Sequence, residues 1–250
     1  MNTYLACIWK TNAHSPLRQE IFLPYLLRKP SRSDTWHSPS GLVEIHAFEY
    51  WPELVLPGKC LLKKENAALC FDGFPDTGSG TDLASPEEYE RALFDVAVQD
   101  LHRLQGEFSL AYANDNAISV FINRNGSHAL YYTDHHDYIA FSNRLPLLLQ
   151  LPGACPELDP EAAQWLCYQG FTQCGVTAFK AIRKLPPGAR AVATAEGRLD
   201  IRPTTYSDLR ALTPQDISLG NLQGVFDEHC AALSGYMKRM HRFYSGHGMT

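Results

Sequence analysis

The stretch Phe121–Asn143, FINRNGSHALYYTDHHDYIAFSN, decides which fold the chain adopts. Apolar, strand-like segments alternate in it with turn residues, and Asn125-Gly126 is the dipeptide that most strongly favours a tight turn between two strands. Together with the segment before it, the stretch predicts four short strands, at 107–113, 117–123, 128–132 and 138–142. The sequence therefore predicts an antiparallel meander in the middle of the chain.

Further strands are predicted on both sides of this meander. Before it, the apolar segments 3–9, 42–51 and 67–73 have strand character, and the Ser- and Pro-rich segment 28–41 is expected to be a polar loop. In the second segment, Val43, Ile45 and Ala47 point to one face while Glu44, His46 and Phe48 point to the other. After the meander, the segment 184–202 is expected to form a loop, a strand, a turn at Gly197 and a closing strand.

Three helices are predicted from capping residues. Ser85 stands three residues before Glu88, with Pro86 in the first turn, which predicts a helix reaching residue 104. Asp159 before Pro160 begins a second helix, with Ala162, Trp165 and Leu166 as its apolar residues. A capping box at 213–216 begins a third helix that runs to about residue 243, with an apolar stripe that is most simply a core face: Leu222, Phe226, Leu233, Met237 and Met240. The pattern predicts an α+β fold for residues 1–206, with two antiparallel sheets between helices.

Composition excludes several classes of function. The chain has 250 residues, a net charge of −5 and a pI near 6.0, so we expect neither a nucleic-acid partner nor a membrane-surface partner. Its seven cysteines are scattered without a paired spacing, which favours reduced thiols in the cytoplasm. We find no signal peptide and no apolar run near the roughly 20 residues that a bilayer requires.

Three blocks of sequence resemble the asparagine synthetase family. The stretch Phe121–Pro146 is similar to that family's Arg-Asp-Arg-x-Gly, Leu-Tyr-Tyr and Phe-Ala-Ser-Glu series. It reads here Asn123-Arg124-Asn125-Gly126, then Leu130-Tyr131-Tyr132, then Phe141-Ser142-Asn143. Upstream, the segment 104–115 resembles the family's Leu-x-Gly-x-Phe strand. Downstream, 158–188 is the closest match and ends in Leu185-Pro186-Pro187-Gly188. The resemblance covers about a hundred residues, and residues 1–100 match poorly.

The resemblance implies a class II glutamine amidotransferase domain at 1–206, an Ntn-hydrolase-like αββα sandwich of two antiparallel sheets. It implies that 207–250 is the linker and first helix of an incomplete ATP-pyrophosphatase domain. In this family the first domain releases ammonia from glutamine, and the second adenylates a carboxylate and forms an amide. We therefore expect no cofactor in this chain, ATP and Mg²⁺ for the downstream synthetase domain, and a small-molecule or peptide carboxylate as substrate. A homodimer is left open.

The residue that performs the glutaminase chemistry is absent from the expected place. Such enzymes use an N-terminal cysteine whose thiolate attacks the glutamine amide while the free α-amine acts as base. Here the chain begins Met1-Asn2-Thr3, and Asn2 has no nucleophile. Thr3 and Cys7 would need further residues removed, and Cys7 in its apolar strand is expected to be a small buried core residue. We therefore expect no catalytic residue in this chain.

Recognition residues are altered as well. Asp72-Gly73 is the expected counterpart of the family's Asn-Gly pair, which exchanges an amide donor for a carboxylate. The family's early arginine and the aspartate before its long helix have no clear counterpart. Structural roles are expected for Arg124 and Gly126 in the meander and for Pro186, Pro187 and Gly188 in the following loop. The run 134–137, Asp-His-His-Asp, contains residue types that bind metals, but it is expected to be a polar hairpin tip without a metal.

Three functions remain open from the sequence. The first is the N-terminal part of an asparagine-synthetase-like ligase with an inactive glutaminase domain. β-Lactam synthetases and lasso-peptide cyclases are relatives that use the substrate's own amine. The second is an active glutamine-hydrolysing asparagine synthetase with a processed N-terminus, which the intact mass of the mature N-terminus would reveal. The third is a non-catalytic scaffold or binding module.

The resemblance also predicts what the gene encodes beyond Thr250. A short strand and a Ser-Gly-Gly-x-Asp-Ser pyrophosphate-binding loop are expected within a few residues, since the last helix opens the synthetase domain in this family. Sequencing the gene past this codon tests the expectation. A stop codon there, without a Gly-rich Asp-Ser motif downstream, would favour the scaffold hypothesis.

Overall fold

The computed structural model describes residues 2–11, 14–50, 59–77, 85–99, 103–170, 172, 175–203 and 219–243. Their strands form two six-stranded antiparallel sheets. The first sheet has the order β10 (Arg183–Lys184), β8 (Tyr131–Asp134), β9 (Tyr138–Ser142), β1 (Thr3–Trp9), β3 (Val43–Glu49) and β2 (Arg32–His37). The second has the order β12 (Leu199–Arg202), β11 (Arg190–Thr194), β7 (Ala117–Ile122), β6 (Gln105–Asn114), β5 (Ala67–Asp76) and β4 (Leu61–Lys64).

The two sheets pack face to face around the central core. Strand alternation sends Tyr4, Ala6 and Ile8 of β1 into this space, where they join residues of the second sheet such as Cys70 and Val120. The other residues of β1 point away from the second sheet, and Leu5, Cys7 and Trp9 belong to an outer cluster. The expected two-sheet α+β sandwich is therefore confirmed.

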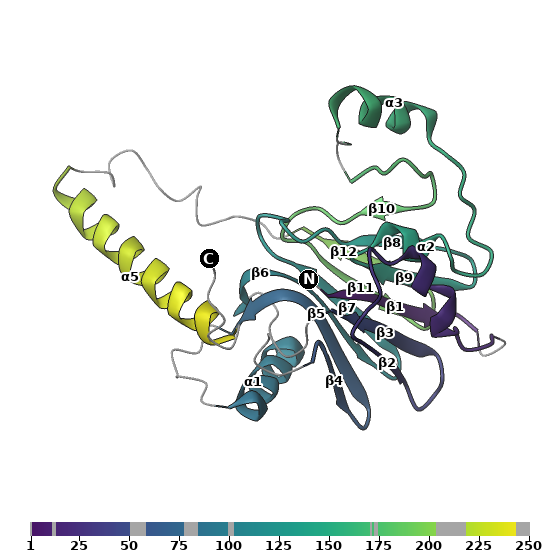
Figure 1. Ribbon diagram of the computed structural model, residues 1–250, viewed down its shortest axis with the longest axis horizontal. Helices are drawn as coiled ribbons and strands as arrows, with labels where there is room; N and C mark the ends of the chain where they lie inside the picture. Colours follow the sequence, from purple (N-terminus) through teal and green to yellow (C-terminus); the bar gives the residue numbers. More distant parts are fainter. Residues whose placement is uncertain are drawn as a thin grey trace.

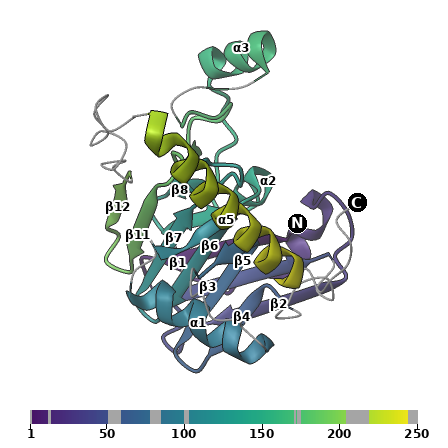
Figure 2. The same cartoon turned by 90° about the vertical axis from the view of Figure 1, so that its left-hand side faces the viewer.

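Helices cover the outer face of each sheet (Figures 1 and 2). On the second sheet, α1 (Pro86–Gln99) and the C-terminal end of α5 (Leu219–Phe243) bury Tyr89, Phe94 and Phe243 against Phe71 and Phe74. On the first sheet lie only short elements: η1 (Gln19–Ile21), η2 (Leu23–Tyr25) and α2 (Leu145–Leu148). The two predicted helix starts are confirmed, since the Ser85 hydroxyl accepts from the Glu88 N–H at 3.2 Å and Asp159 Oδ1 from the Ala162 N–H at 3.1 Å.

The expectation that the apolar stripe of the last helix forms a core face is wrong in part, and the second predicted helix buries one of its apolar residues. In α3 (Pro160–Gln169), Ala162 is buried, but Trp165 and Leu166 are exposed. In α5, the apolar stripe does not form a core face along the whole helix, because Phe226 and Leu233 are each 61% exposed and Met237 is 44% exposed. Only the last turns, with Tyr236, Met240 and Phe243, pack against the body. Helix α5 extends outward from there (Figure 1).

Four local differences from the predictions also appear. The expected polar loop 28–41 contains β2, which pairs along β3 and buries only Trp36 among mostly polar residues, so its pattern lacked an apolar alternation. Strand β4 was not predicted. The meander is divided, since β6 and β7 lie in the second sheet and β8 and β9 in the first. Residue 104 lies outside helix α1, immediately before β6, and residues 51 and 213–218 of the predicted elements lie outside the described residues.

The predicted loop and strand after residue 184 are confirmed. The loop Leu185-Pro186-Pro187-Gly188 leads into β11, which pairs with β7 and β12. Within the described residues, no helix is long and apolar enough to cross a lipid bilayer.

A buried carboxylate ties the first sheet to the segment that covers it. Glu44 on β3, only 1% exposed, accepts hydrogen bonds from Trp9 Nε1 at 2.7 Å and from the Leu17 N–H at 3.2 Å, and its Oε2 lies 3.1 Å from His46 Nε2. Burial alone would raise the pKa of Glu44. The hydrogen bond and the charge of His46, together with the hydrogen bonds from Trp9 and Leu17, outweigh the effect of burial. They hold the pKa of Glu44 below its ordinary value of 4.5.

We expect Glu44→Gln to lower the free energy of unfolding at pH 7 by about 1–3 kcal/mol, because buried donors lose a charged acceptor. Because the pKa of Glu44 is lower in the folded state than in the unfolded state, its ionised form stabilises the fold above about pH 4.5, and this contribution is lost as the pH falls through the folded pKa. The difference between variant and parent should therefore shrink in acid. Urea denaturation at pH 7 and pH 4 measures it, with exposed Glu65→Gln as control, and a difference independent of pH would contradict the assignment.

Candidate functional site

The N-terminal end of β1 meets the second sheet at a polar cluster. The backbone N–H of Asn2 donates to Asp72 Oδ1 on β5 at 2.6 Å. Asn2 and Asp72 are both buried, with 7% and 3% of their surfaces exposed. A hydrogen bond between an amide and an ionised carboxylate in such surroundings is strong and directional. It connects the central region of one sheet with the other and fixes where the chain begins.

The end of β9 holds the same residues from the other side. Asn143 Oδ1 accepts from the Tyr4 N–H at 2.9 Å, and its Nδ2 donates to the Asn2 carbonyl at 2.7 Å. The neighbouring Ser142 hydroxyl donates to the Tyr4 carbonyl at 2.6 Å and accepts from the Arg144 N–H at 3.0 Å. The side chains of Ser142 and Asn143 therefore extend the hydrogen bonding between β9 and β1 beyond the backbone pairs.

Asp72 has a second partner on the loop that crosses between the sheets. Its Oδ2 lies 2.9 Å from Nδ1 of His128, a partly buried residue. The next residue, Gly73, has a φ of +89° and packs tightly, since a Cβ there would lie 2.1 Å from the Glu107 carbonyl oxygen and 2.7 Å from His128 Cε1. Glycine is required at this position both for its backbone conformation and for space.

A second carboxylate, Glu107, lies near His128. Glu107 on β6 accepts hydrogen bonds from Asn123 Nδ2 at 3.0 Å, from Asn125 Nδ2 and from the Ser127 hydroxyl. Burial opposes its ionisation, but these hydrogen bonds and the nearby His128 lower the pKa of Glu107. The loop 123–128 is thus folded around Glu107, and it presents His128 to Asp72.

The two blocks of sequence expected to be structural meet in space. A Cβ on Gly126, which has a φ of +66°, would lie 2.9 Å from Pro187 Cγ. The Gly188 N–H donates to the Asn123 carbonyl at 3.0 Å, and the Ala189 N–H donates to the Pro186 carbonyl at 3.1 Å. Close packing of the loop 123–128 on the Leu-Pro-Pro-Gly loop explains why glycine and proline occur there.

Arg124 belongs to the same loop 123–128. Its side chain is exposed and lines a cleft of about 440 Å³, whose lining includes Arg103, Glu107, Asn123 and Tyr236. The expected structural role of Arg124 stays a prediction.

The residues considered as substitute nucleophiles are buried. Cys7 points into the outer cluster of the first sheet, away from Asp72, and burial together with the nearby Glu44 raises its pKa well above the ordinary value. A thiol of this kind stays protonated at neutral pH and is a poor nucleophile. Thr3 is also buried and lines a cavity of about 220 Å³ together with Leu27, Arg28, Tyr50 and Arg144.

The Asp-His-His-Asp run forms the connection between β8 and β9, as expected for a hairpin tip. Potential ligand atoms of His135, His136 and Asp137 lie within 4.8 Å of one another. However, the Asp137 N–H donates to His135 Nδ1 at 3.3 Å, and the Lys10 ammonium binds Asp134 at 2.7 Å and the His135 carbonyl at 2.6 Å. A nitrogen engaged as an acceptor and an adjacent cation both disfavour a metal ion here.

Sequence reasoning located Asp72 and Gly73 but missed the residues that surround them. His128, Glu107 and Asn143 were not singled out, although Asn143 stands in the Phe-Ser-Asn series and the other two flank recognised motifs. Their proximity to Asp72 arises from the pairing of β5 with β6 and from the crossing loop, and neither leaves a mark in local sequence.

Comparison with known proteins gives one family match and several similar structures. Residues 91–206, which is 116 of the 250 residues, match the family described as "Glutamine amidotransferase domain". No curated protein matches the chain in sequence. This part of the chain is therefore similar to a glutamine amidotransferase domain.

Several solved structures share a general likeness. Glutamine phosphoribosylpyrophosphate amidotransferase from B. subtilis, complexed with ADP and GMP, has 14% identity and a TM-score of 0.38, and the alignment covers 67% of this chain and 36% of that one. A structure described as the allosteric regulatory enzyme of purine biosynthesis has 14% identity and a TM-score of 0.38, covering 82% and 44%. A glutamine aminotransferase class-II domain protein from Silicibacter pomeroyi has 10% identity and a TM-score of 0.32, covering 82% and 98%. The chain thus spans less than half the length of the first two proteins.

The tight packing at Gly73 gives a test of the site's geometry. We expect Gly73→Ala to lower the free energy of unfolding by about 3 kcal/mol or more, because the new methyl group overlaps the Glu107 carbonyl and His128. Gly41→Ala is the matched control, since Gly41 has a similar φ of +74° but no atom within 4 Å of its Cβ. It should cost only about 1 kcal/mol from the backbone conformation. Urea denaturation compares the two, and equal losses would show that the packing around Asp72 and His128 is looser than described.

Proposed function

We propose that this chain is the glutaminase-type part of an asparagine-synthetase-like, ATP-dependent amide-forming ligase, and that its own glutamine-hydrolysing site is inactive. The observation that carries the proposal is the hydrogen bond from the Asn2 N–H to Asp72 Oδ1 at 2.6 Å. The contact supports the proposal because the family resemblance expects a thiol where Asn2 stands and an amide donor where Asp72 stands.

The carboxylate is unsuited to the chemistry of amide hydrolysis. When a nucleophile adds to an amide carbonyl, negative charge develops on the oxygen, and hydrogen-bond donors aimed at that oxygen stabilise it. Asp72 offers acceptor oxygens only, and its negative charge would repel the developing oxyanion. Losing one oxyanion donor alone costs about 10²–10³ in rate, before the repulsion is added.

The nucleophile is also missing, and its loss costs more. Removal of a catalytic nucleophile lowers turnover on the order of a million-fold in a well-studied protease. Asn2 carries a neutral carboxamide, while Cys7 is a protonated core thiol on the opposite face of β1. Two independent requirements of the reaction are therefore unmet by the residues present.

The remaining activity belongs to other parts of the proposed ligase. A downstream synthetase domain would bind ATP and Mg²⁺ and activate the carboxylate of a small molecule or peptide. An amine of the substrate itself would replace ammonia, since the proposed glutaminase site supplies none. A cytoplasmic location fits these substrates and the free cysteines among the described residues.

Glutamate release tests the inactive site directly. We expect purified protein to release no glutamate from glutamine above the enzyme-free background. Release that disappears in Cys7→Ala or Thr3→Ala would contradict the proposal, because it would identify a working nucleophile. Intact mass of the protein's N-terminus, measured on the same sample, establishes which residue comes first.

A repair experiment tests the role assigned to Asp72. With Met1 removed, Asn2→Cys combined with Asp72→Asn should exceed Asn2→Cys alone by about tenfold or more, since the oxyanion regains a donor and loses a repelling charge. Asn2→Cys combined with Asp95→Asn, an exposed position on α1, is the matched control. Equal rates for the two double variants would remove Asp72 from the explanation.

A further inference from the structure

Among the described residues, the outer face of the second sheet is covered over only part of its width. The apolar cluster under α1 and α5 draws residues from β4, β5, β6 and β7, and none from β11 or β12. Figure 2 shows β11 and β12 at the sheet's edge, beyond the two helices. The last strand, β12, has β11 as its one neighbour within the described part of the chain. This corner of the molecule therefore offers both a sheet face and a strand edge.

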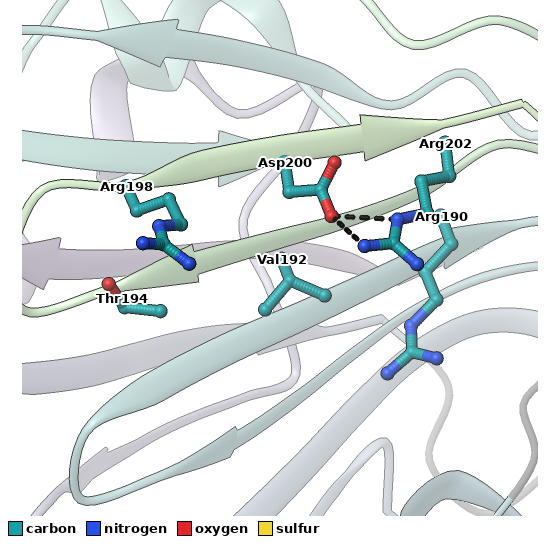
Figure 3. A pocket seen from close by; sticks show the side chains of 6 residues that line it. All are labelled: Arg190, Val192, Thr194, Arg198, Asp200 and Arg202. Carbon is teal, nitrogen blue, oxygen red and sulfur yellow. Dashed lines mark hydrogen bonds and ion pairs between the residues drawn. The ribbon is translucent and has the colours of Figure 1, made fainter.

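A shallow cavity of about 290 Å³ lies on this face (Figure 3). Six side chains, defined here as the arginine face, line it: Arg190, Val192, Thr194, Arg198, Asp200 and Arg202. Those of β11 alternate with the buried Ala191 and Ala193, which point into the core between the sheets. Five of the six residues belong to β11 and β12, and Arg198 directly precedes β12.

The arginine face carries positive charge that its own residues do not neutralise. It holds three guanidinium groups and one carboxylate, in a chain whose net charge is −5. Asp200 Oδ2 accepts from both Nε and Nη2 of Arg202 at 2.7 Å, so this carboxylate is already engaged. Arg190 stands directly opposite Arg202 in the strand register, and like charges in such pairs destabilise a sheet.

Arg190 provides a second, independent observation. Its Nε atom is buried and has no hydrogen-bond partner among the described residues. Buried donors without a partner are rare in folded proteins, and a bound ligand is one reason for them. A guanidinium group recognises carboxylates through paired, parallel hydrogen bonds.

The spacing of the charges indicates the shape of the ligand. Arg190 and Arg202 lie at one end of the arginine face, and Arg198 lies beside Thr194 at the other (Figure 3). Four residues of β-strand separate the ends, which is roughly 13 Å, with Val192 between them. An extended peptide repeats its side chains on one face at every second residue, so positions i and i+4 span the same distance.

We propose that the arginine face binds an extended acidic peptide segment of a partner protein, with acidic residues at i and i+4 and an apolar residue at i+2. The segment lies across the face of β11 and β12, where the acidic side chains meet the arginines at the two ends and the apolar one meets Val192. Nucleic acid fits less well, since the chain is acidic as a whole and none of the six lining residues is aromatic.

Fluorescence anisotropy with a labelled peptide of sequence Thr-Glu-Thr-Val-Thr-Glu-Thr tests the proposal. We expect saturable binding that weakens with added salt, and at least tenfold weaker binding of the matched peptide with both glutamates replaced by glutamine. Arg190→Gln and Arg198→Gln should each weaken binding about tenfold. Arg91→Gln, at an exposed position on α1, should leave it unchanged.

Several results would overturn the proposal: equal affinity for the glutamate and glutamine peptides, no effect of the arginine variants, or tighter binding of a single-stranded RNA oligomer. Arg198 is exposed, so Arg198→Gln keeps the test valid even if Arg190→Gln impairs folding, which circular dichroism would reveal. The Asp72→Asn variant should bind the peptide normally, because the arginine face acts independently of the proposed loss of glutaminase activity.

Discussion

The hydrogen bond between the Asn2 amide and the Asp72 carboxylate is the constraint on which the site depends. It fixes the first residue of the central strand β1 against β5 of the opposite sheet, and Asn143 holds the same residue from β9. Asn2 is therefore held by both sheets, through Asp72 and through Asn143. His128, Gly73 and Glu107 are then placed by their contacts with Asp72 and with one another.

An amide-hydrolysing enzyme needs polar groups that are free to bind its substrate. In this arrangement the polar groups bind one another instead. Each oxygen of Asp72 already has a partner, one on Asn2 and one on His128. Glu107 likewise uses its oxygens on Asn123, Asn125 and Ser127. The oxygens of both carboxylates are already engaged by donors of the protein, and a ligand that used them would have to replace those hydrogen bonds at a cost. Because their oxygens bind groups of the protein, Asp72 and Glu107 fit a structural junction better than a substrate site.

Local sequence predicted the elements with strong local signals, and it failed where pairing partners decide the structure. The caps at Ser85 and Asp159, the alternation in β3 and the strand after Gly188 follow from residues close together in the chain. Strand β2 did not, because its polar residues become a strand only by pairing with β3. The same holds for the site: Asp72 was found through its motif, whereas His128 and Glu107 are recognisable only once the crossing loop is folded.

The two surfaces that the fold leaves uncovered suit different kinds of contact. The exposed residues of α5, Phe226, Leu233 and Met237, are apolar, so covering them is favourable at about 25 cal/mol per Å² and is little affected by salt. Under the proposed function, this is the surface for permanent packing against the downstream domain. The arginine face has charge but little apolar area, so attraction between charges would speed encounter while salt and competing water keep the affinity moderate. A surface of that kind suits a partner that binds transiently. Because the arginines are held at fixed positions by β11 and β12, the spacing of acidic residues in the partner decides whether it binds.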